Sequence, residues 1–138
     1  MNYLLVGIAG IIGALLRYLV GFSFSKWWFH DFPLATFITN MLGSFILGWF
    51  THFLPRLKFL HPHMITALGT GLIGAFTTFS TFSVETIQLI STGKWGTALL
   101  YVLLSLSCGI LFSWVGYQAG MNGGKDIEAR SKNRGEQK

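Results

Sequence analysis

The sequence predicts an all-α membrane protein with four transmembrane helices, the third of them broken near mid-membrane. Of its 138 residues, 51% are hydrophobic and only 11% are charged, whereas about a quarter of the residues in a soluble domain are charged. The apolar residues gather in four segments of at least about 20 residues, the length that crosses a bilayer. Glycine and hydroxyl residues interrupt the third segment. The length leaves no room for a large domain outside the membrane.

The first span is expected at residues 3–24. It begins without a basic leader and no convincing cleavage site follows, so we interpret it as a retained helix and not as a signal peptide. Gly7, Gly10 and Gly13 repeat at helical spacing and predict a smooth face for helix packing. Arg17 is charged within this apolar segment, and snorkelling or capping at the interface is as good an explanation for it as function.

The second span is expected at residues 33–54. Thr36 and Asn40 lie one helical turn apart and share a face. An unpaired Asn side chain at membrane depth costs a few kcal/mol, so Asn40 must be hydrogen-bonded or face a ligand. Ser44 and Gly48 form a pair of small residues suited to close helix packing.

The third span, expected at residues 64–90, holds the most informative stretch of the chain. As one helix it would be roughly 40 Å long, which exceeds a hydrocarbon core of about 30 Å. Residues 69–83 include three glycines and six hydroxyl residues, and they predict a break near residues 71–77 that leaves two half-helices. Backbone outside a helix is tolerated in lipid only where it is buried in protein or lines a wet cavity, so the break marks an ion or substrate site. A continuous, tilted helix is the alternative.

The fourth span is expected at residues 95–119, where Gly116 and Gly120 add another small pair. The four spans form one transmembrane domain at residues 1–120, and residues 121–138 are expected to be a charged, disordered tail. Because so small a bundle carries several smooth faces, we expect it to form a dimer.

Short turns that carry interfacial residues separate the four spans. These residues are Lys26, Trp27, Trp28, His30, Asp31, Arg56, Lys58, His61 and Lys94. When the basic residues of the tail are included in the count, the positive-inside rule favours both termini inside the cell. Without the tail the two sides carry almost equal numbers of cations, so orientation stays open.

Composition excludes several function classes. The basic residues of the tail are not interleaved with aromatic residues, so we expect no nucleic-acid partner. The histidines lie near interfaces, and no Ser, Cys or carboxylate accompanies them at the spacing of a catalytic triad or metal site, so we expect no enzyme. His61 and His63 would bind a metal only if their side chains converged. Cys108 is the only cysteine, which rules out a disulfide within the chain.

Aromatic and polar side chains cluster around the predicted break. Phe76, Phe79 and Phe82 recur every three residues and are expected to share a helix face. Packing is the usual role of such a stripe, although ring edges carry partial positive charge and could hold a small anion beside a donor such as Asn40. Glu85 lies only about 7 Å from its helix end, where it could line a vestibule or pair with a cation.

Hydroxyl residues also lie near the break. Ser80 and Thr81 follow it directly, and Thr36 shares its face with Asn40. A hydroxyl group can serve an ion of either sign, but in membranes it more often bonds to its own helix or to a neighbouring one.

Three motifs carry a resemblance to a known family. They are Gly10-x-x-Gly13-Ala-x-x-Arg17-Tyr18, Thr36-x-x-x-Asn40-x-x-Gly43-Ser-Phe, and Thr66-x-x-Gly-Thr-Gly-x-x-Gly74-x-x-Thr77-Thr-Phe-Ser-Thr-Phe-Ser-x-Glu85. Over about residues 3–119 the chain resembles the Fluc/CrcB family of fluoride ion channels. The Thr-Thr-Phe-Ser-Thr-Phe element is the most specific part of that resemblance.

The resemblance implies a passive channel in the bacterial cell (plasma) membrane. It would let cytoplasmic fluoride leave and so reduce fluoride toxicity. It implies an antiparallel, dual-topology-type dimer with two pores, formed with an identical chain or a sister subunit. It also implies a structural sodium ion, Na⁺, at the dimer interface, held by the backbone carbonyls of Gly74 and Thr77 and not transported.

The resemblance also implies roles along a fluoride pathway. Phe79 and Phe82 would form an aromatic box, and Asn40 would donate to fluoride. A polar track would consist of Thr36, Ser80 and Thr81, and Glu85 would lie towards a vestibule. The chain departs from the family at Gly109, where members often carry a hydroxyl residue.

Two other functions remain as alternatives. A small multidrug-type exporter also has four spans, but it would need a carboxylate deep in the first span for proton coupling, and residues 3–22 contain none. A membrane scaffold that transports nothing would leave the glycine-rich break and Asn40 unexplained.

Overall fold

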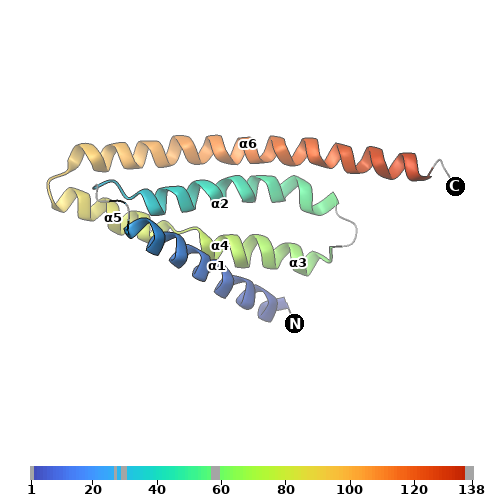
Figure 1. Cartoon of the computed structure of the whole chain (residues 1–138), viewed down its shortest axis with the longest axis horizontal. Coiled ribbons are helices and arrows are strands. Elements are labelled where there is room, and N and C mark those ends of the chain that lie inside the picture. The colour runs from blue at the N-terminus through green and yellow to red at the C-terminus, as the bar shows by residue number, and fades with distance from the viewer. Residues whose placement is uncertain (1, 27, 29–30, 57–59, 136–138) are drawn as a thin grey trace.

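The computed structural model describes residues 2–26, 28, 31–56 and 60–135, and within these ranges the side chains from Tyr3 to Gly123. Trp27, His30 and Lys58, which the sequence places in interfacial turns, lie outside these residues. The described residues form helices and no strands (Figure 1). The elements in order are α1 (Asn2–Ser25), α2 (Leu34–Phe53), η1 (Leu54–Arg56), α3 (Pro62–Thr66), η2 (Ala67–Ile73), α4 (Gly74–Phe76), α5 (Phe79–Ser91) and α6 (Trp95–Gly135).

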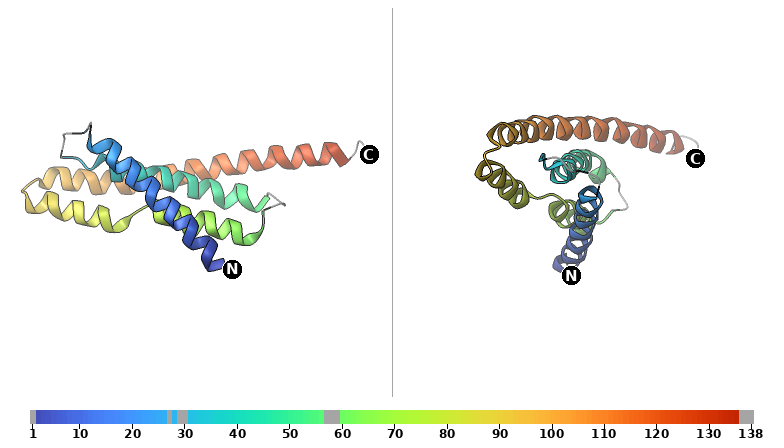
Figure 2. Two further views of the ribbon diagram at one scale, coloured as in Figure 1. Left: turned by 60° about the horizontal axis from the view of Figure 1, so that its bottom comes forward. Right: turned by 60° about the vertical axis from the view of Figure 1, so that its left-hand side comes forward.

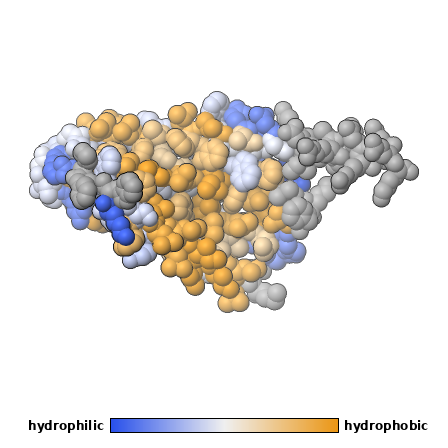
Figure 3. Space-filling model, viewed as in Figure 1, coloured by the Kyte–Doolittle hydropathy of each residue, from blue (hydrophilic) through white to orange (hydrophobic). Residues whose placement is uncertain are grey.

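Four helical stretches are long and apolar enough to cross a membrane. Among the described residues they are Tyr3–Ser25, Leu34–Arg56, Pro62–Ser91 and Trp95–Gly123. Figure 3 shows a broad band of hydrophobic side chains over the middle of the molecule, with hydrophilic residues towards both ends. The prediction of an all-α, multi-pass membrane protein with four transmembrane helices is confirmed.

The third stretch changes its winding twice. The chain begins it in α3, continues as the π-helix η2 through Gly69 and Gly71, and returns to α-helix at Gly74, where α4 begins. Thr77 and Thr78 then have extended backbone, with ψ angles of 158° and 122°, before α5 begins. Figure 1 shows this segment as a thin connection between α4 and α5. Its depth in a bilayer stays a prediction.

α1 packs against η2 through glycine. It crosses the third stretch obliquely (Figure 2). A Cβ atom at Gly13 would lie 2.1 Å from the carbonyl oxygen of Leu72, and one at Gly71 would lie 2.6 Å from that of Val6. Only glycine permits such close backbone contact, as the predicted smooth face requires. Gly7, predicted on the same face, has nothing within 4 Å of its Cβ position.

α2 and α6 lie side by side and approach even more closely (Figure 1). A Cβ atom at Gly48 would lie 2.3 Å from the carbonyl oxygen of Ser113, and one at Gly116 would lie 2.0 Å from that of Phe45. At Gly120 the corresponding distance, to the carbonyl oxygen of Trp49, is 2.7 Å. The predicted packing roles of Gly48, Gly116 and Gly120 are therefore confirmed.

The hairpin between α5 and α6 is anchored at its turn and by its core. Gly93 has a φ angle of 77°, which favours glycine because it has no Cβ. Next to it, Lys94 forms an ion pair with Asp31. Tyr101 is fully buried, and the rings of Phe32 and Phe82 pack against it at centroid distances of 5.3 and 5.0 Å.

α6 extends well beyond the other helices (Figure 2). Its helical backbone runs to Gly135, through most of the segment predicted as a tail. Near the end of the bundle, Nη1 of Arg56 donates to the carbonyl oxygen of Met121 at 3.1 Å. This bond ties the end of the second span to α6. The predicted disorder of residues 121–138 and their separation from the rest of the chain stay predictions.

Candidate ion pathway

Asn40 pairs with the extended backbone that precedes α5. Its Nδ2 donates to the carbonyl oxygen of Thr78 at 3.0 Å, and its Oδ1 accepts from the Thr78 N–H at 2.9 Å. The side-chain amide of α2 thus satisfies both backbone groups of a residue that has left the helix, as a neighbouring strand would. The sequence predicts that Asn40 is either hydrogen-bonded or faces a ligand, and in the structure it is hydrogen-bonded. Because Nδ2 carries two hydrogens, one N–H group remains to donate elsewhere.

The same geometry releases two carbonyl groups from helical bonding. In a continuous helix, the Gly74 carbonyl would accept from the N–H of Thr78, and the Thr77 carbonyl would accept from that of Thr81. In this structure, the Thr78 N–H donates to Asn40 and the Thr81 N–H donates to Oγ1 of Thr78 at 3.2 Å. These two carbonyl oxygens are the ones that the family resemblance implies as sodium ligands, and the loss of their helical donors leaves them able to accept from another partner or to bind a cation.

Hydroxyl groups gather at the first turn of α5. Thr78 is buried and caps the helix, and its Oγ1 lies 3.2 Å from Oγ of Ser80 and 3.0 Å from Oγ1 of Thr81. The N-terminus of a helix carries partial positive charge, which favours an anion. Ser80 and Thr81 are exposed at this positive end.

Two of the three predicted aromatic residues share a face. The rings of Phe79 and Phe82 lie 5.8 Å apart, and Phe79 is 79% exposed. Phe76 does not belong with them, so that part of the sequence prediction is wrong. It ends α4, is buried, and is separated from α5 by the extended Thr77 and Thr78, which interrupt the helical spacing.

Glu85 is held by two hydroxyl groups from other helices. Thr36 Oγ1 donates to its Oε1 at 2.8 Å, and the hydroxyl of Tyr101 donates to its Oε2 at 2.9 Å. The sequence analysis missed Tyr101. One signal was available, since a Tyr hydroxyl inside an apolar segment needs a partner and Glu85 is the only carboxylate within the spans.

Some of the predicted site residues line an open groove of about 330 Å³. Asn40, Thr77, Phe79 and Phe82 line it, and Ser105 and Gly109 of α6 contribute to the same wall. Glu85 instead lines a second hollow of about 350 Å³, beside Asp31 and Gln88. The predicted site residues are therefore only partly brought together. Four line the groove and Glu85 lines the second hollow, whereas Thr36, Gly74, Ser80 and Thr81 line neither.

These features define a class of protein, a small helical membrane protein with a polar groove where its third span leaves the helix. The family model described as "CrcB-like protein, Camphor Resistance (CrcB)" matches residues 4–117. The chain belongs to the CrcB family, and the resemblance seen in its motifs is confirmed.

Relatives in several bacteria agree with this assignment. The chain is 52% identical over 118 residues to "Fluoride-specific ion channel FluC 1" of Bacillus cereus (strain ATCC 14579), covering 86% of this chain and 82% of the relative. It is 47% identical over 119 residues to "Fluoride-specific ion channel FluC 2" of Geobacillus kaustophilus, covering 86% and 92%. It is 43% identical over 120 residues to "Fluoride-specific ion channel FluC" of Oceanobacillus iheyensis, covering 87% and 92%.

Proposed function

We propose that this protein is a passive fluoride channel of the bacterial plasma membrane that exports cytoplasmic fluoride. The names of its relatives support the ion, and the groove lined by Asn40, Phe79 and Phe82 is the observation that carries the proposal. An ion channel catalyses no reaction, in agreement with the absence of a catalytic motif from the sequence.

The groove suits a small, strongly hydrated anion. Such an ion gives up water only where the pore offers replacement donors at several sites, none of them strong enough to trap it. The second N–H of Asn40 is such a donor within the groove. The hydroxyls of Ser80 and Thr81 would add donors beside it, since they lie at the positive end of α5 within 3.2 Å of the Thr78 hydroxyl, and Thr78 lines the groove. The edges of the Phe79 and Phe82 rings add partial positive charge.

Thr36 and Glu85 lie further along the proposed route. Thr36 donates a hydrogen bond to Glu85, and Glu85 lines the second hollow together with Gln88, which supports a vestibule there. The hydroxyl of Tyr101 holds the other carboxylate oxygen and so orients Glu85. We assign Tyr101 a positioning role.

An antiparallel dimer would complete the pathway. In the single chain the groove is open and Phe79 is 79% exposed. Val84 and Ile87, on the same helix, are 55% and 63% exposed. A second subunit would cover this apolar surface and enclose the groove on its open side.

Na⁺ fits the carbonyl oxygens of Gly74 and Thr77 as a structural ion at the centre of that dimer. A hard cation prefers oxygen ligands, and both of these carbonyls have lost their helical donors to Asn40 and to the Thr78 hydroxyl. When bound, the ion would neutralise their partial negative charge. In this arrangement the interruption of the third span would lie near mid-membrane.

Fluoride release from loaded liposomes tests the proposal. Liposomes that contain the purified protein should release fluoride down its gradient, followed with a fluoride electrode, and protein-free liposomes should not. An imposed proton gradient should leave the rate unchanged when the membrane potential is held fixed. Release that requires the proton gradient would favour an exporter, and an absence of release would favour a scaffold.

A further inference from the structure

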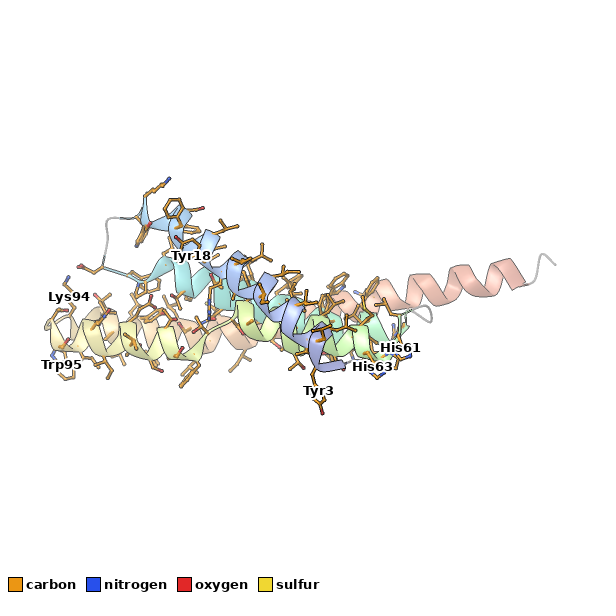
Figure 4. All side chains as sticks on the ribbon, turned by 90° about the horizontal axis from the view of Figure 1, so that it is seen from below. Tyr3, Tyr18, His61, His63, Lys94 and Trp95 are labelled. Carbon is orange, nitrogen blue, oxygen red and sulfur yellow. The ribbon has the colours of Figure 1, made fainter. Side chains whose placement is uncertain are left out.

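His61 and His63 form a pair that the proposed ion pathway does not use. Their ring centroids lie 4.4 Å apart, with ring planes inclined by 32°. Figure 4 shows the two side chains next to each other where α3 begins, far along the bundle from Lys94 and Trp95. The convergence that metal binding would require is therefore present in the structure.

The backbone holds this pair together. His61 caps α3, and its Nδ1 accepts from the backbone N–H of His63 at 3.5 Å. Pro62 lies between the two residues and fixes its own φ angle, so little backbone freedom is left to lose when the rings share a ligand. At 3.5 Å the hydrogen bond is weak, and it competes poorly with a metal ion for a ring nitrogen of His61. Both residues are exposed, so an ion can reach them from solvent.

We propose that His61 and His63 bind a late divalent transition-metal ion such as Cu²⁺, Ni²⁺ or Zn²⁺. Imidazole nitrogen is a preferred ligand of these ions. In the part of the chain that the structure describes, no group of three or more His, Cys, Asp or Glu residues is placed to hold a metal, so water completes the coordination. The positive end of α3 opposes a cation, and we therefore expect reversible binding and not a permanently loaded site.

Copper titration tests the proposal directly. Cu²⁺ is added to the full-length, tag-free protein in detergent, and electron paramagnetic resonance reports the nitrogen ligands of the bound ion. We expect saturable binding with a spectrum of two imidazole nitrogens. His61→Asn, which keeps a capping oxygen, and His63→Gln should each weaken binding by about tenfold or more, because one of two protein ligands is lost.

His52→Gln is the matched control. His52 lies in α2 and its ring packs edge-on to that of Tyr117 at a centroid distance of 4.4 Å, so it is not one of the two proposed ligands and copper binding should be unchanged. Gel filtration verifies that each variant is folded. A double variant, His61→Asn with His63→Gln, that binds Cu²⁺ as tightly as the unmodified protein would overturn the proposal. Because copper binding is measured without transport, this failure would leave the proposed channel function untouched.

Discussion

The contact between α2 and α6 differs sharply from the surface of α5. At Gly48 and Gly116 the two helices approach until backbone meets backbone, and even a methyl group would collide. On α5, by contrast, the ring of Phe79 projects from the chain and is 79% exposed beside an open groove. One region is completed by the chain itself. The other carries polar and aromatic groups beside an open groove, which the proposed second subunit would enclose.

This difference separates stability from transport. Substitutions in the α2–α6 contact should act on folding, because they disturb packing that the chain already makes. Substitutions on the exposed face of α5 should act on ion flux, because little of the chain's own packing depends on them. Asn40 and Tyr101 belong to both regions, since each joins a packed helix to the polar pathway.

The largest effect is expected at Gly116. Gly116→Ala would place a methyl group 2.0 Å from the carbonyl oxygen of Phe45, so α2 and α6 must move apart. Overpacking of this kind costs about 1–3 kcal/mol, and more where backbone must shift. Thermal melting and gel filtration in detergent should show a large loss of folded protein. Gly7→Ala is the control, because nothing lies near its Cβ; equal stability of the two variants would refute the packing argument.

Phe79→Ile should have the opposite effect to Gly116→Ala, because it should change ion flux and leave stability almost unchanged. Since the ring is mostly exposed, the melting temperature should be nearly unchanged, but loss of the ring edge should slow fluoride release from liposomes. We expect a fall of about tenfold or more, equivalent to about 1.4 kcal/mol on the barrier. Phe82→Ile should slow release similarly and lower stability as well, because Phe82 packs on Tyr101. Unchanged flux in both variants would contradict the aromatic box.

Asn40→Ala should affect both properties. It leaves the N–H and carbonyl groups of Thr78 without their side-chain partner, at a cost of about 1–3 kcal/mol, and it removes a donor from the groove. Melting temperature and fluoride release should both fall. Thr51→Val, which removes an exposed hydroxyl bonded within α2, should change neither. A stable Asn40→Ala variant with normal flux would show that Asn40 has neither role.

The smallest effect is expected from Tyr101→Phe. The ring stays in the core, and Glu85 loses one of its two hydroxyl partners while Thr36 remains. Stability should fall by about 1 kcal/mol, and fluoride release should slow less than in Phe79→Ile. A larger loss of flux than in Phe79→Ile would mean that Tyr101 contacts the ion and does not merely orient Glu85.

Local patterns predicted much of the fold. Apolar length alone located four spans, and small residues at helical spacing located the faces that α2 and α6 use for packing, because both features depend on neighbours along the chain. The requirement for an Asn40 partner also followed from elementary energetics. These inferences need no knowledge of which helices meet.

Features that depend on contacts between residues far apart in the chain could not be predicted from the sequence. The interruption was expected at residues 71–77, but extended backbone occurs at Thr77 and Thr78, where Asn40 supplies bonds from 38 residues away. Of the three glycines before it, Gly69 and Gly71 lie in the π-helix η2, which packs on α1, and Gly74 begins α4. The same interruption removed Phe76 from the aromatic face. Tyr101 was missed because its bond to Glu85 spans the α5–α6 hairpin.

Ion selectivity tests the central claim most directly. Liposomes that contain the unmodified protein are loaded with fluoride or with chloride, and release of each anion is measured at the same membrane potential. A groove of separate weak donors and ring edges predicts fast release of fluoride and little release of chloride. Equal release of the two anions would contradict the account.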